Sequence, residues 1–101
     1  MENFKSYFFK AYFELAEKSA GIVDIPDLRE RVSIRVLRVH KMILTEDQFD
    51  KMLRDILFKT DEYIISLGKP MGAREKLFEY KGDYFRTLLV KNRKREERNE
   101  R

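Results

Sequence analysis

The chain has 101 residues, 43% hydrophobic and 13% aromatic, which is enough for one compact domain with a single core. Charged residues make up 40%, but 22 Lys and Arg against 18 Asp and Glu leave a net charge of only +4, which excludes an acidic disordered chain and a histone-like polycation. With no Cys, one His and four Gly, the sequence lacks the material for a thiolate metal site, a catalytic triad or a Gly-rich phosphate loop. We therefore expect a small non-catalytic protein without cofactor or metal.

The first residues argue against export. Charged side chains at positions 5, 10, 14, 17 and 18 interrupt the apolar run that a signal peptide needs. No segment approaches the roughly 18 consecutive apolar residues of a membrane span. We expect a cytoplasmic protein with no membrane contact. The scarcity of Asn and Gln beside many charged residues is typical of thermophile proteins.

The first predicted element is a helix over residues 2–19, ended by a left-handed cap at Gly21. Its apolar stripe at helical spacing consists of Phe4, Phe8, Ala11, Tyr12 and Leu15. Three more residues, Phe9, Phe13 and Ala16, make the stripe wider than one packing partner would cover. Either both flanks are buried in one core, or these three residues form a homodimer interface.

A short β-branched run, Ile22 to Ile25, predicts a brief strand before Pro26, which fits the first position of a helix. The apolar residues that follow at helical spacing are Leu28, Val32, Val36, Val39 and Ile43. We predict a second helix over residues 26–39, although residues 33–40 also contain good strand formers.

The clearest local signal is Thr45-Glu46-Asp47-Gln48, a capping box that starts a third helix ending near Lys59 or Thr60. A buried stripe runs from Phe49 to Leu57. After this helix we predict a strand over residues 63–67, a breaker at 68–72, a strand at 77–80, a tight turn at 81–83 and a strand at 84–90. Residues 92–101 lack apolar side chains and are expected to be a disordered tail to a domain of residues 1–91.

This order of elements resembles the winged helix-turn-helix family: an α+β fold with three helices and a small antiparallel sheet whose last loop is the wing. The resemblance runs from about Phe4 to Lys91 and is carried by four local features. These are the Ile25-Pro26 helix entry, the Thr45 capping box, the Phe49 to Leu57 stripe and the paired strands around residues 68–84.

The resemblance implies duplex DNA as the partner, with the third helix in the major groove and the wing on the backbone. Gln48, Lys51 and Arg54 would then face bases. The residues expected to contact phosphates are Arg29, Arg31, Arg35, Arg38 and Lys41 on the second helix, Lys69, Arg74 and Lys76 on the wing, and Arg93, Lys94 and Arg95 in the tail. Such backbone contacts predict modest sequence specificity.

The charge of the third helix favours a second hypothesis. Between Thr45 and Glu62, six acids stand against three bases, which opposes insertion between phosphates. The same fold also serves as a protein-protein module, so the acidic third helix could instead dock a basic partner protein. A third interpretation is that the Arg residues form a solvated face with surface ion pairs. We interpret the strand aromatics as core or cross-strand pairs, rather than a stacking platform, and His40 as a surface residue.

Overall fold

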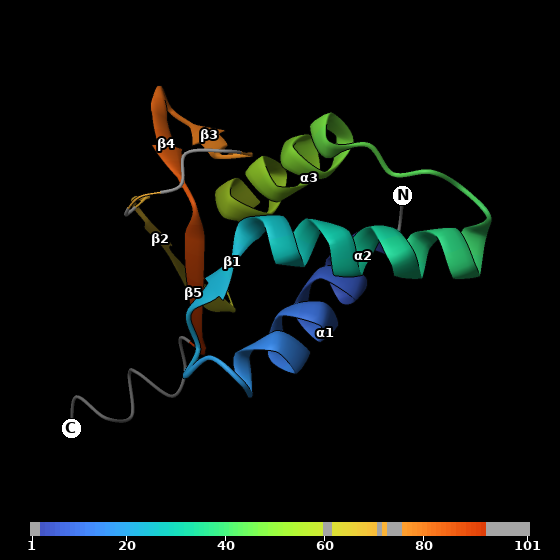
Figure 1. Cartoon of the computed structure of the whole chain (residues 1–101), viewed down its shortest axis with the longest axis horizontal. Coiled ribbons are helices and arrows are strands. Elements are labelled where there is room, and N and C mark those ends of the chain that lie inside the picture. Colours follow the sequence, from blue (N-terminus) through green and yellow to red (C-terminus); the bar gives the residue numbers. More distant parts are fainter. Residues whose placement is uncertain (1–2, 60–61, 71, 73–75, 93–101) are drawn as a thin grey trace.

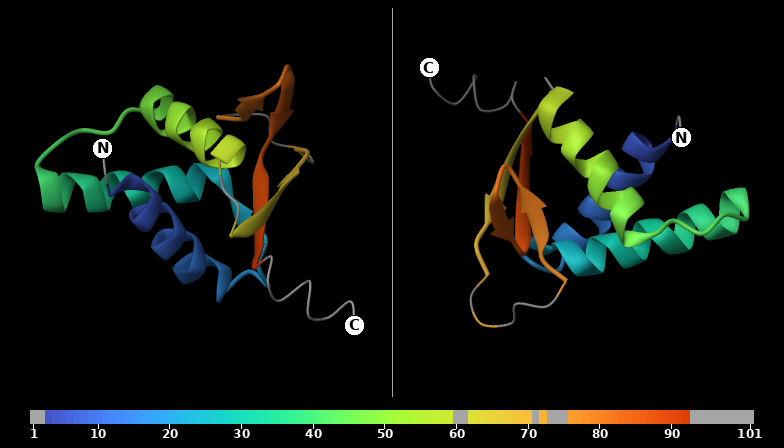
Figure 2. Two further views of the ribbon diagram at one scale, coloured as in Figure 1. Left: turned by 180° about the vertical axis from the view of Figure 1, so that it is seen from behind. Right: turned by 90° about the horizontal axis from the view of Figure 1, so that it is seen from above.

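The computed structural model describes residues 3–59, 62–70, 72 and 76–92. Its helices are α1 (Phe4–Ala16), α2 (Ile25–His40) and α3 (Glu46–Lys59). Its strands are β1 (Val23–Asp24), β2 (Tyr63–Gly68), β3 (Phe78–Tyr80), β4 (Asp83–Phe85) and β5 (Thr87–Asn92). The three helices lie on one side of the sheet, and the end of α2 projects beyond the other two (Figures 1 and 2). The fold is α+β, as predicted, and is compatible with a winged-helix-like arrangement.

The first helix is shorter than predicted. It ends at Ala16 because the N–H groups of Lys18 and Ser19 turn to acceptors three residues back, at 3.2 Å each. The chain then reverses through Ala20 and Gly21, with φ of 55° and 91°. The expected glycine does adopt a left-handed conformation, but it follows a turn rather than directly capping the helix.

The second helix runs one residue further at each end than predicted, and residues 33–40 are helical throughout. Pro26 lies in its first turn, where a missing N–H costs no hydrogen bond. The helix stops at Lys41, whose backbone is left-handed with φ 57°. The predicted short strand before the helix is present as β1.

The predicted capping box at the start of α3 is confirmed. The Gln48 N–H donates to the Thr45 hydroxyl at 3.1 Å, and the Thr45 N–H donates to Gln48 Oε1 at 2.9 Å. Phe49, Leu53 and Ile56 form the buried face of the helix. This face packs on α1, where the rings of Phe4 and Phe49 meet edge to face at 5.6 Å.

The central sheet is antiparallel in the order β1-β5-β2, with Leu88 opposite Val23 and Val90 opposite Ile65. A second two-stranded sheet pairs β3 with β4. The strand predicted over residues 84–90 is divided at Arg86, because the chain changes partner there from β3 to β1 and β2. We call the described residues between 69 and 86, namely 69, 70, 72 and 76–86, the wing; they include this hairpin.

Tyr12 joins the helices to the sheet. Its hydroxyl donates to the Gly21 carbonyl at 2.6 Å and accepts from the Val90 N–H at 3.0 Å. The ring is 2% exposed and lies in one continuous core that all three helices share with β1, β3 and β5. The wing and the helices are thus held in fixed positions around this core.

Candidate nucleic-acid interface

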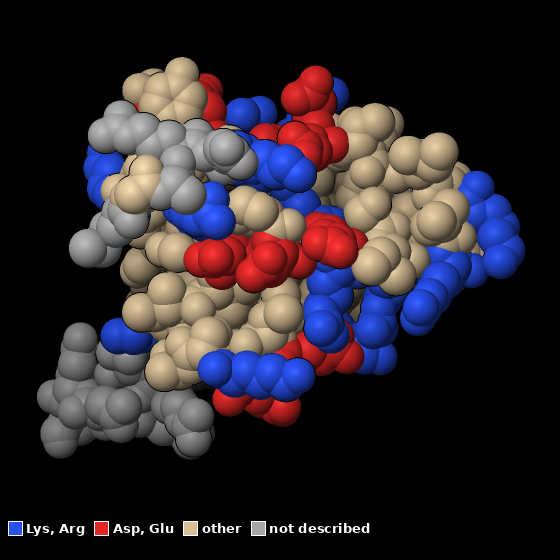
Figure 3. Space-filling view, in the orientation of Figure 1, with Lys and Arg blue, Asp and Glu red and all other residues tan. Residues whose placement is uncertain are grey.

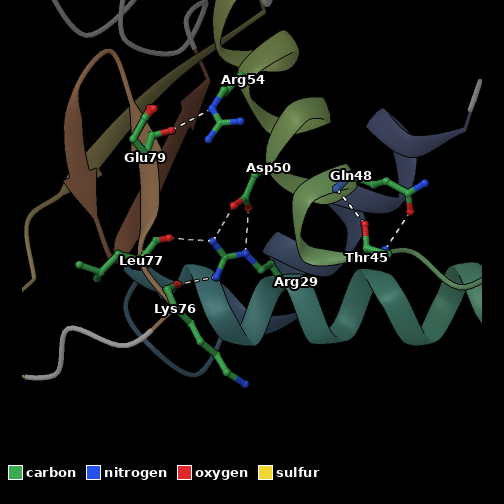
Figure 4. Close-up of polar contacts among 8 residues, drawn as sticks. All are labelled: Arg29, Thr45, Gln48, Asp50, Arg54, Lys76, Leu77 and Glu79. Carbon is green, nitrogen blue, oxygen red and sulfur yellow. Dashed lines mark hydrogen bonds and ion pairs between the residues drawn. The ribbon is translucent and has the colours of Figure 1, made fainter.

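Arg29 fastens the wing to the helices. Its guanidinium donates to both carboxylate oxygens of Asp50 on α3, at 2.9 and 3.0 Å, and to the carbonyls of Lys76 and Leu77 (Figure 4). The residue is only 6% exposed. Arg29 was predicted to contact phosphates, but four of its N–H groups are directed at acceptors within the protein. The sequence did contain an indication that Arg29 is buried. Arg29 lies four residues after buried Ile25 and three before buried Val32, which places it on the buried side of the helix.

Arg54 makes a second attachment. Its Nε donates to the Glu79 carbonyl at 2.9 Å, and its guanidinium lies 5.4 Å from the centre of the buried Phe78 ring (Figure 4). Arg54, predicted to face bases, thus has its Nε–H directed at the wing. Strand β3 consequently packs on α3, and part of the helix face expected to enter a groove is already covered.

The wing exposes Lys69, Lys76 and Lys81. Lys81 and Gly82 form the hairpin tip with φ of 53° and 82°, as a type I′ turn requires. Lys69 pairs with Asp83, which follows the hairpin tip directly. Its hydrogen bond to this carboxylate, aided by the Tyr84 N–H, lowers the Asp83 pKa below its usual value. This turn was predicted from the sequence, but Lys81 was not among the predicted basic contacts. Arg74 lies outside the described residues.

The residues of α3 that were predicted to contact bases are engaged within the protein or lie beside acids. The side-chain oxygen of Gln48 accepts a hydrogen bond in the capping box. Lys51 is exposed, but Asp47 and Asp55 lie four residues before and after it on the same side of the helix. Both acids are exposed, and Lys59 pairs with Asp55 at 3.2 Å. The outer side of α3 is therefore not a basic surface.

Apart from Arg29, the predicted phosphate contacts on α2 and at its end divide into two groups. Arg31 and Arg35 pair with Glu14 of α1, at 3.4 and 3.6 Å. Arg38 and Lys41 are exposed at the projecting end of the helix. Only this second group is available to phosphates without breaking a contact with α1. The predicted tail contacts Arg93, Lys94 and Arg95 lie outside the described residues.

The predicted homodimer face on α1 is largely internal. Phe9 is 8% exposed and stacks on Tyr63 of β2 with ring centres 4.4 Å apart, so little of its side chain is accessible to the predicted dimer interface. Ala16 is half-buried and packs against the core, whereas Phe13 is 46% exposed. The width of the α1 stripe arises because the helix packs on the other helices and on the sheet simultaneously.

His40 and Phe78, for which no binding role was predicted, both contact other parts of the protein. His40 is half-buried rather than on the open surface, and its Nε2 lies 2.9 Å from the Tyr7 hydroxyl. Phe78 belongs to the core, as expected for a strand aromatic. Across residues 3–59, 62–70, 72 and 76–92, no cluster of His, Asp or Glu has the geometry of a metal site. None of the helices in these ranges is long and apolar enough to cross a membrane.

Comparisons with protein-family models, curated proteins and solved structures found no match to this chain. The functional assignment therefore depends on the wing, the acidic outer side of α3 and the exposed end of α2.

Proposed function

We propose that this chain is a small, non-catalytic DNA-binding protein of the cytoplasm, which contacts the duplex backbone mainly through its wing and acts in transcriptional or other DNA-linked regulation. The observation that carries the proposal is the rigid attachment of a wing with three exposed lysines. Arg29 and Arg54 fix the wing backbone from two different helices. Binding through residues 76–86 therefore requires little ordering of this hairpin, which reduces the entropic cost of association.

The acidic residues on α3 disfavour binding through this helix. Asp47 and Asp55 would meet phosphates if α3 entered a major groove, and this repulsion disfavours base reading by the helix. A duplex held by the wing can avoid these carboxylates. We expect binding with modest sequence preference, because phosphate contacts carry no base information.

The test is fluorescence anisotropy of a labelled random-sequence duplex over a range of salt concentrations. Each phosphate contact contributes about 0.9 to the slope of log affinity against log salt. The variant Lys76→Gln/Lys81→Gln should therefore lose about 1.8 from this slope and bind more weakly at every salt concentration.

The matched control is Lys5→Gln/Lys10→Gln, which removes two exposed lysines from α1. It has the same net charge as the wing variant, so it measures the general effect of charge. The proposal is contradicted if both variants lose the same affinity, or if the wild-type protein fails to bind the duplex at low salt. Circular dichroism of each variant confirms that it is folded.

A second function, docking of a partner protein, is favoured by one observation on α3. Phe58 is 80% exposed at the end of the helix and lines a groove with Met52, Ile56 and Phe4 of α1. The charged side chains of this groove are one acid, Asp55, and four bases, Lys5, Lys51, Arg54 and Lys59. The groove therefore fits an acidic amphipathic helix better than the basic partner that the net charge of α3 suggested. The probe is a fluorescent glutamate- and leucine-rich helical peptide. Binding that is lost in Phe58→Ser but kept in the wing variant supports this function, and equal binding by wild type and Phe58→Ser contradicts it.

A further inference from the structure

The outer face of α2 has no covering element. Ile34 lies at its centre, two residues from each of the fully buried Val32 and Val36, which places it about 200° around the helix from both. Ile34 is 44% exposed, and Leu37 beside it is 51% exposed. Figures 1 and 2 show α2 at the front of the molecule, with α1 and α3 behind it. This face is therefore free to pack against another molecule.

Arg31 and Arg35 border this face but are paired with Glu14, and the charges that remain without an ion pair among the described residues are separated by sign. Asp27 and Glu30 lie in the N-terminal half of α2, and Arg38 and Lys41 lie at its C-terminal end. Figure 3 shows acidic side chains over one half of this face and basic side chains over the other. Glu30, Ile34 and Arg38 are spaced four residues apart, so they share one side of the helix.

Glu30 and Arg38 are not used inside the domain. Arg31 and Arg35, on the side nearer α1, are both paired with Glu14. Glu30 and Arg38, by contrast, make no ion pair or side-chain hydrogen bond within the part of the chain that the structure describes. A surface with an acid at one end, an apolar centre and a base at the other end is complementary to itself when one copy is reversed.

We propose that α2 is the interface of a homodimer in which two copies pack antiparallel about Ile34. A twofold axis near this residue places Glu30 opposite Arg38 of the partner subunit and, by symmetry, Arg38 opposite Glu30 of the partner subunit. Ile34 then meets Ile34 of the partner subunit at the centre, and Asp27 faces the projecting end of the partner helix. This interface lies on α2, not on the α1 residues that the sequence analysis suggested.

The area buried between the two α2 helices indicates how tightly the dimer is expected to form. A helix of 16 residues is about 24 Å long, so one helix pair buries an area at the low end of specific interfaces, below about 1,200 Å². We therefore expect a reversible dimer whose population rises over micromolar protein concentrations. High salt should weaken it, because its charge pairs are near the surface.

The test is sedimentation equilibrium of the full chain at several concentrations, with charge-reversal variants. Glu30→Arg and Arg38→Glu each place two like-charged pairs across the axis, so each should raise the dimer dissociation constant roughly tenfold or more. In an equimolar mixture, Glu30→Arg presents only bases at these positions and Arg38→Glu presents only acids. The mixture should therefore form a heterodimer, and the double variant Glu30→Arg/Arg38→Glu should dimerise as the wild type does.

Lys51→Glu is the matched control, because it reverses an exposed charge on α3 and leaves the α2 face unchanged. It should dimerise normally. A wild-type protein that sediments as a monomer at every concentration overturns the proposal, and so does an Arg38→Glu variant that dimerises as well as the wild type. Failure of the mixed variants to associate also overturns it, because complementary charge is its central requirement.

Discussion

At the scale of single residues, the Arg29 to Asp50 pair shows how one side chain can connect three parts of the chain. The Arg29 and Asp50 side chains are 7% and 13% exposed, so neither charge is fully hydrated. Two further N–H groups of the guanidinium donate to carbonyls of the wing. Removing one partner would leave the other charge buried and unpaired, which is strongly destabilising. Replacing both partners with apolar residues changes the stability much less.

We predict that Arg29→Met lowers the free energy of unfolding by about 3 to 5 kcal/mol, since it leaves the Asp50 carboxylate unpaired. Urea denaturation of the purified protein measures this loss. The double variant Arg29→Met/Asp50→Leu should recover much of the stability, because no buried charge remains. A loss below about 1 kcal/mol for Arg29→Met would indicate an ordinary surface pair and contradict this description.

At the scale of elements, local signals determined where most helices and strands begin. The capping box starts α3 at the predicted position because its hydrogen bonds involve only Thr45 and Gln48. Pro26 and the β-branched residues before it likewise located β1 and the start of α2. The break at Arg86 was missed because it depends on a change of partner between distant strands. The end of α1 was missed although its hydrogen bonds are local, because the turn begins before the first Gly of the sequence.

We predict that Thr45→Ala destabilises the protein by about 1 kcal/mol, because the Gln48 N–H loses its side-chain acceptor. The midpoint of thermal unfolding, followed by circular dichroism, measures this effect. Ser6→Ala is the control, since Ser6 is an exposed residue within α1 and caps no helix. Equal midpoints for Thr45→Ala and wild type would show that the capping box contributes nothing to stability.

At the scale of the whole molecule, the helical layer and the sheet are joined through one buried hydroxyl as well as through apolar packing. The Tyr12 hydroxyl connects α1 to the turn at Gly21 and to β5. The Val90 N–H that it accepts from is buried, so this group has no access to water as an alternative partner. The orientation of the sheet against α1 therefore depends on this residue.

We predict that Tyr12→Phe lowers the unfolding free energy by about 1 to 3 kcal/mol, because it leaves a buried N–H without an acceptor. Hydrogen exchange of the Val90 amide should accelerate more than that of other β5 amides. The matched control is Tyr84→Phe, which removes a hydroxyl from a side chain that is 55% exposed. Unchanged stability and exchange in Tyr12→Phe would contradict the role of this hydroxyl.

The sequence by itself determined the α+β class, the order of the elements and most of the core, because helical spacing, capping residues and turn glycines act within a few residues of each other. It did not determine the surface. Only the tertiary structure showed that Arg29 and Arg54 hold the wing, that Phe9 is internal, and that one face of α2 is uncovered. The physical reason is that the hydration and pairing of a charge depend on which distant segments reach it, and sequence spacing does not specify those contacts.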